Sequence, residues 1–134
     1  MTGRRRNKVR QRAGQLCEYC HLPESISDVP FHIEHIRAKQ HGGKASMANL
    51  ALACDRCNLL KGPNLSAVDP ITQNIVLLFH PRQDKWSEHF ELQGAKIAGL
   101  TSKGRATVNL LQMNAAKRVQ LRAALIAANL FPLN

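Results

Sequence analysis

The sequence predicts a single α+β domain with a small antiparallel sheet and flanking helices. Its length of 134 residues is that of one ordinary domain. Of these residues 44% are apolar, which is enough for a modest core. Short segments with strand character lie between segments with helical spacing, as expected when helices and antiparallel strands share one core.

A basic helix is expected near the N-terminus, over residues 4–14. Val9 and Ala13 lie on one side of it, basic residues lie on the other, and Gly14 ends it. Further helical segments are expected as a single turn at 49–53, a helix at 55–61 ended by Gly62-Pro63, a helix at 102–113 capped by Thr101, and a last helix after Asn114.

Short strands are expected in both halves of the chain. At residues 30–36 apolar and polar side chains alternate. Residues 75–79 contain the longest apolar run and predict a buried strand, with 88–92 and 96–100 as its partners. We therefore expect one domain over 1–134 with three parts: the basic helix (4–14), a core (15–63) and a C-terminal β/α extension (68–134).

The charge of the chain indicates an anionic partner. Lys and Arg total 19 against 9 Asp and Glu, which gives a formal net charge of +10 and favours ligands such as nucleic acid. Aromatic residues make up only 4%, which argues against a single-strand binder built on stacked rings. The apolar runs are too short for a membrane span and none follows the basic N-terminus, so we expect a cytoplasmic protein without a membrane partner.

The cysteines form two close pairs, Cys17-x-x-Cys20 and Cys54-x-x-Cys57. Because thiols in the cytoplasm stay reduced, this pattern predicts four thiolates around one tetrahedral zinc ion rather than disulfides. Four thiolates leave no position for a substrate, so this zinc would be structural. A redox pair, or two unrelated buried pairs, are the alternatives.

Further motifs lie between and just after the cysteine pairs: Glu34-His35, Gly42-Gly43, Asn49-Leu50, Asn58 directly after Cys57, and Lys61-Gly62. In this order and near this spacing they resemble the HNH nuclease family, whose active site is a ββα-metal centre. The resemblance covers residues 17–62. A weaker one, to the C-terminal extension of a bacterial subset of that family, runs through His80-Pro81-Arg82, Trp86, His89-Phe90 and Gly104-Arg105-Ala106-Thr107.

The chemistry of four of these residues fits hydrolysis of a phosphodiester bond. His35 is the candidate base, because histidine changes charge near physiological pH and can accept a proton from water. Glu34 and Asn58 are candidate ligands for one divalent metal ion, and such oxygen ligands favour Mg²⁺ or Mn²⁺. Asn49 can form a hydrogen bond near the imidazole and fix its orientation. The resemblance implies the same four roles, although Asn58 stands where the third letter of the family's name calls for His.

Candidate contacts to nucleic acid gather near the N-terminus, in the loop after His35 and at two later positions: Arg4, Arg5, Arg6, Lys8, Arg12, Arg37, Lys39, His41, Lys61 and Arg105. The predicted site contains no obvious base-reading element, so we expect recognition of the backbone and shape of a duplex to dominate. A solvated tail and a solvated helix face are the alternative, which also applies to Lys117, Arg118 and Arg122.

The pattern as a whole predicts a metal-dependent DNA endonuclease. An inactive zinc-stabilised module that binds nucleic acid is the alternative, because it explains the cysteines and the charge equally well. Only the endonuclease explains why Glu34, His35, Asn49 and Asn58 occur together. One such site cuts one strand per encounter, so double-strand cleavage would need two encounters or two copies, as in a dimer. A zinc ribbon that binds another protein would leave the basic ends without a purpose.

Overall fold

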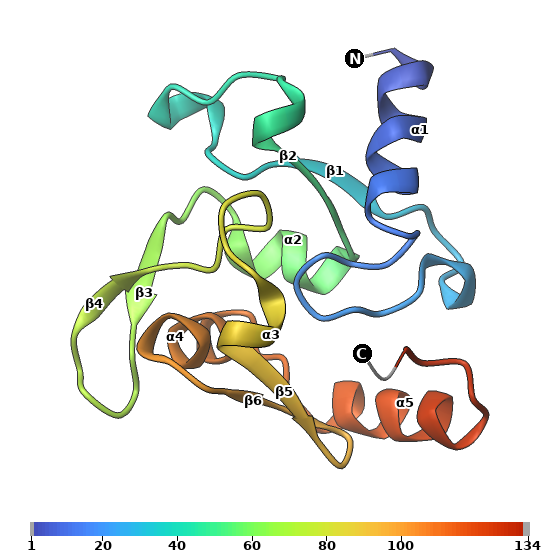
Figure 1. Ribbon diagram of the computed structural model, residues 1–134, viewed down its shortest axis with the longest axis vertical. Helices are drawn as coiled ribbons and strands as arrows, with labels where there is room; N and C mark the ends of the chain where they lie inside the picture. Colours follow the sequence, from blue (N-terminus) through green and yellow to red (C-terminus); the bar gives the residue numbers. More distant parts are fainter. Residues whose placement is uncertain (1, 133–134) are drawn as a thin grey trace.

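The computed structural model describes residues 2–132 and places them in three two-stranded antiparallel sheets with helices packed around them (Figure 1). The elements in chain order are α1 (Gly3–Arg12), β1 (His32–His35), β2 (Leu50–Ala53), α2 (Asp55–Lys61), β3 (Ser66–Val68), β4 (Ile75–Leu77), α3 (Trp86–His89), β5 (Phe90–Gln93), β6 (Lys96–Gly99), α4 (Ser102–Leu110) and α5 (Ala116–Ala127). Short 3-10 turns occur at Glu24–Ile26, Lys39–His41 and Met47–Asn49. The predicted α+β class is confirmed.

Strands β1 and β2 and helix α2 form a ββα unit. The strands pair antiparallel, in a register that sets His32 against Ala53 and His35 against Leu50. Helix α2 begins two residues after β2 and packs against β1. The prediction of a helical turn at 49–53 is wrong. The apolar run from Leu50 to Ala53 is buried along its whole length, so it shows no alternation, and its pairing with β1 makes it a strand.

The basic N-terminal helix is confirmed as α1. Its cap is Thr2, whose hydroxyl accepts a hydrogen bond from the Arg5 backbone N–H at 3.2 Å. Val9 is its buried apolar contact with the rest of the protein, and α1 packs against β2. Gly14, with φ of +64°, turns the chain into the segment that carries the first cysteine pair.

The pairing predicted for the second half of the chain is wrong in part. Strand β4 pairs with β3, and β5 pairs with β6, as two separate hairpins. The apolar run at 75–79 was expected to be buried, but Ile75 and Leu77 are 75% and 65% exposed. They lie on the outer face of the β3–β4 hairpin, and α4 covers the inner face.

One cluster of buried side chains runs through the ββα unit and the C-terminal extension. Its large members include Val9, Tyr19, Phe31, Leu50, Leu52, Phe79, Phe90, Ile97, Leu111 and Met113. Phe79 joins the two parts, because its ring makes edge contacts with Tyr19 at 6.3 Å and with Phe90 at 5.1 Å between centroids. The C-terminal extension and the ββα unit therefore share one hydrophobic core.

Candidate active site and metal centre

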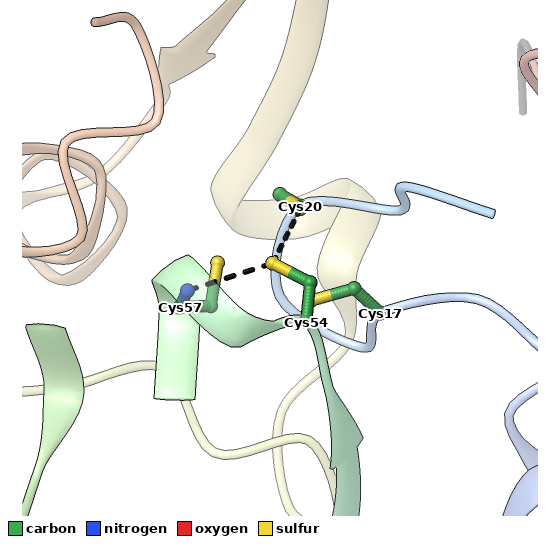
Figure 2. Close-up of side chains that lie close together, drawn as sticks. All are labelled: Cys17, Cys20, Cys54 and Cys57. Carbon is green, nitrogen blue, oxygen red and sulfur yellow. Dashed lines mark hydrogen bonds between the residues drawn. The ribbon is translucent and has the colours of Figure 1, made fainter. Parts of the chain in front are cut away.

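The four cysteines come together as one buried cluster. Their sulfur atoms all lie within 4.8 Å of one another and point toward a common centre (Figure 2). The Sγ atoms of Cys20 and Cys54 are 3.8 Å apart. A tetrahedral zinc ion with Zn–S bonds of about 2.3 Å requires about this separation between its sulfur ligands. The cluster is therefore arranged to hold a metal ion. It joins the segment before β1, which carries Cys17 and Cys20, to the N-terminal end of α2, which carries Cys54 and Cys57.

Backbone and side-chain donors surround these sulfur atoms. Cys54 caps α2, and its Sγ accepts a hydrogen bond from the Cys57 backbone N–H at 3.5 Å. Arg118 reaches in from α5, and its Nη2 lies 3.1 Å from the Sγ of Cys57 and 3.8 Å from that of Cys54. Burial alone would lower the pKa of Arg118, but the thiolates of Cys57 and Cys20 outweigh it and hold that pKa above its ordinary value. Sequence reasoning left Arg118 undecided between phosphate and solvent, because no local pattern relates α5 to the cysteines.

Glu34 lies on the side of β1 that faces α2. It is only 7% exposed, and its Oε1 accepts a hydrogen bond from the Tyr19 hydroxyl. Its Oε2 lies 3.7 Å from Nζ of Lys61, which donates to the Ile36 carbonyl at 2.8 Å. Burial raises the pKa of Glu34, and the Lys61 ammonium and the Tyr19 hydroxyl oppose that rise. The distance to Lys61 is longer than a hydrogen bond, so Oε2 can still accept a further ligand.

His35 is the last residue of β1, directly after Glu34. Successive side chains of a strand point to opposite faces, so both can serve one site only where the strand ends. Strand β1 ends at this position. The Nε2 atom of His35 is buried, and within residues 2–132 it has no hydrogen-bond partner. A buried nitrogen of this kind calls for a water molecule or a ligand beside it.

Asn49 uses its side-chain amide to close the loop that follows His35. Its Oδ1 accepts from the Arg37 backbone N–H at 2.8 Å, and its Nδ2 donates to the carbonyls of Arg37 at 3.0 Å and Lys44 at 2.9 Å. The sequence suggested a hydrogen bond near the imidazole, but these bonds go to the backbone. Asn49 can therefore orient His35 only through the chain that leaves it.

The close packing around Gly43 explains why the second position of the Gly-Gly motif in this loop is a glycine. A Cβ atom at Gly43 would lie 1.7 Å from the Arg37 carbonyl oxygen and 2.9 Å from Nδ2 of Asn49. No side chain fits at that position. Gly42 differs, because its φ of +83° puts it in the left-handed region while its surroundings are open.

Asn58 lies on α2, one turn before Lys61. Residues three apart on a helix are neighbours on its surface, so Asn58 lies on the side of α2 that presents Lys61 to Glu34. It is partly exposed. A carboxylate and an amide oxygen are hard ligands, and their chemistry fits a divalent ion such as Mg²⁺ or Mn²⁺.

The candidate nucleic-acid contacts separate into three groups. Eight are exposed, and six of these form no side-chain hydrogen bond within residues 2–132, namely Arg4, Arg6, Lys8, Arg37, Lys39 and His41. Arg5 and Arg12 donate to backbone carbonyls and fasten α1 to the loop before β2. Lys61 is 2% exposed, and Arg105 binds the buried carboxylate of Asp69 through two hydrogen bonds of 3.0 and 2.8 Å. The placement of Lys61 and Arg105 argues against the phosphate contacts expected of them, because partners within the fold hold both charges.

Residues 17–64 match the family model described as HNH endonuclease. The match covers less than half of the chain and includes the four cysteines together with Glu34, His35, Asn49 and Asn58. The resemblance drawn from the motifs is thereby confirmed. No curated protein and no solved structure matches the chain. Among residues 2–132, no helix is long and apolar enough to cross a membrane.

Proposed function

From the HNH domain that residues 17–64 carry, we propose that this protein is a metal-dependent endonuclease that hydrolyses phosphodiester bonds of duplex DNA. The observation that carries the proposal is the buried Nε2 of His35, which lacks a partner within residues 2–132. A nuclease uses such a nitrogen as the base, and only a nuclease also uses the Glu34, Asn49 and Asn58 that accompany His35 in the sequence.

Two metal centres follow from the donor sets. The four cysteines would hold a structural zinc ion, since four thiolates at this spacing suit zinc. Glu34 and Asn58 would hold one Mg²⁺ or Mn²⁺, which when bound supplies positive charge to the scissile phosphate and to the leaving oxygen. The Tyr19 hydroxyl orients the carboxylate of Glu34 from its Oε1 side and so leaves Oε2 for the ion.

The residues of the chain then divide the proton transfer and the positioning between them. His35 accepts at Nε2 the proton of the attacking water, whose oxygen forms the new bond to phosphorus while the bond to the 3′ oxygen breaks and that oxygen takes up a proton from solvent. Asn49 holds the backbone of Arg37 and so fixes the chain that leaves His35. One such site cuts one strand per encounter, so a nick is the expected product.

The test is relaxation of supercoiled plasmid by zinc-loaded protein in Mg²⁺, in Mn²⁺ and with added chelator. We expect nicking in either metal ion and none with chelator. His35→Ala should slow it by about 10²–10⁴-fold, the usual contribution of a general base. His32→Ala is the matched control, since His32 lies on the same strand but is exposed and pairs with Asp55 at 3.1 Å. It should nick as fast as the unaltered protein.

The opposite result would support the inactive binding module. In that case the unaltered protein and His35→Ala would both bind the plasmid, contain zinc and leave it supercoiled in either metal ion. Zinc content and far-UV circular dichroism of each variant separate loss of the base from loss of the fold.

A further inference from the structure

Helix α1 is fastened to the HNH domain along one side. Arg5, Val9 and Arg12 lie on this side, because their spacing of i, i+4 and i+7 places them on one face. Val9 is fully buried. The two arginines donate to carbonyls of the segment leading into β2, at Ala45 (2.6 Å), Met47 (2.8 Å) and Leu50 (2.7 Å).

A neighbouring face of α1 carries four polar side chains at the spacing i, i+3, i+4 and i+7, namely Arg4, Asn7, Lys8 and Gln11. All four are exposed. Within residues 2–132, the side-chain hydrogen bonds of α1 come from Arg5, Arg10 and Arg12, so this stripe has no partner in the protein.

We propose that α1 enters the major groove of the duplex and reads base edges through the stripe of Arg4, Asn7, Lys8 and Gln11. This inference rests on the proposed function, because it names how the same nuclease would select its substrate. It adds direct base contacts to the recognition of backbone and shape that the charge pattern alone predicts.

The side-chain types of the stripe match the groups that the major groove presents. Arginine and lysine donate to the O6 and N7 of guanine, and asparagine and glutamine form paired hydrogen bonds with adenine. From Arg4 to Gln11 the helix rises by about 10 Å, which spans about three base-pair steps. The stripe contains no apolar residue, so it lacks the face that an interfacial membrane helix would bury.

The charges at the start of α1 also favour an anionic partner. The first turn contains no acidic residue and carries Arg4, Arg5 and Arg6 directly after Gly3, beside the positive end of the helix dipole. This repulsion between like charges destabilises the isolated helix, and the phosphate groups of a bound duplex would offset that repulsion.

The fastened side of α1 connects the helix to the proposed catalytic site. Arg5 and Arg12 bind the segment from Ala45 to Leu50, and Asn49 within that segment holds Arg37, two residues after His35. Figure 1 shows α1 at the edge of the molecule beside β1 and β2, with its outer side uncovered. A duplex held by α1 would therefore lie next to the loop that follows the candidate base.

The test is selection from a pool of randomised duplexes, with zinc-loaded His35→Ala protein and no added Mg²⁺, so that binding is read without cleavage. We expect an enriched site of about three base pairs. It should bind at least about tenfold more tightly than a shuffled duplex, since each mismatch in a read site costs about that factor. Removing both amides, as Asn7→Ala with Gln11→Ala, should abolish the preference at the adenine positions of the site and leave affinity for the shuffled duplex and its salt dependence unchanged. Gln120→Ala removes an exposed amide from α5 as the matched control and should keep the preference.

Two outcomes would overturn the inference: a pool that binds without any enriched site, or an adenine preference that survives loss of both amides. Alanine favours helix, so loss of α1 would not explain the result. The plasmid assay reports cleavage separately, so nicking without sequence preference refutes α1 as a reader and leaves the nuclease standing.

Discussion

Replacing Gly43 with alanine should damage the loop beside the candidate base far more than the same change at its neighbour Gly42. A Cβ at Gly43 would lie 1.7 Å from the Arg37 carbonyl oxygen and 2.6 Å from the carbonyl carbon. Ordinary contacts between such atoms lie at about 3.5 Å, so the two backbone segments would have to separate by about 2 Å. That movement breaks the hydrogen bonds of the Asn49 side chain to Arg37, which are 2.8 and 3.0 Å long.

The expected cost follows from these contacts. Two lost hydrogen bonds amount to about 2 kcal/mol, and forcing a methyl group into a filled space adds about 1–3 kcal/mol. Gly43→Ala should therefore lower the free energy of unfolding by about 3–5 kcal/mol. Gly42→Ala meets no atom within 4 Å, so it should cost only the penalty of a left-handed residue, about 1–2 kcal/mol.

Urea unfolding of both zinc-loaded variants, followed by far-UV circular dichroism and compared at equal m-values, measures the difference. The same samples in the plasmid assay show whether the loop is needed for nicking, and Gly43→Ala should be the slower. If Gly43→Ala proved no less stable than Gly42→Ala, the close approach of Gly43 to Arg37 would be refuted.

Two further predictions concern charges held inside the fold. Lys61→Met should lower the free energy of unfolding by about 3–5 kcal/mol, because it leaves the buried Glu34 carboxylate without its cation. In a Glu34→Gln background, Lys61→Met should lower the free energy of unfolding by clearly less. Equal losses in both backgrounds, measured by urea unfolding, would exclude a stabilising interaction between Glu34 and Lys61. Arg118→Met should weaken zinc binding by about 10–100-fold, as loss of outer-shell partners does, in competition with a chromogenic chelator. The exposed Lys117 of the same helix supplies the control, and equal zinc release from Lys117→Met and Arg118→Met would contradict the role of Arg118.

The candidate site could be located from the sequence because its chemistry depends on residue types in a short span. Cys17, Cys20, Cys54 and Cys57 are recognisable since metal coordination restricts both the residue and the spacing. Gly43 belongs to a motif for a similar reason, because only glycine tolerates the approach of Arg37.

The elements that were mispredicted lack a local signal. The run from Leu50 to Ala53 is buried on both sides, so its pattern cannot distinguish a strand from a helical turn. Ile75 and Leu77 are as apolar as core residues, yet they face solvent because β3, rather than a core strand, pairs with β4.

By itself the sequence determined the cysteine metal centre, the first strand and the helix of the ββα unit, and the basic character of both ends. Only the tertiary structure decided which charges are free. Lys61 and Arg118 look like surface cations in the sequence, but one lies beside Glu34 and the other beside Cys57, far away along the chain. The same packing ties the exposed side chains of Arg5 and Arg12 to backbone carbonyls and leaves Arg4 and Lys8 without a hydrogen-bond partner among residues 2–132. Whether a charged side chain faces solvent or binds a partner depends on which part of the chain packs against it. Contacts between residues far apart in the sequence leave no periodic pattern from which they could be predicted.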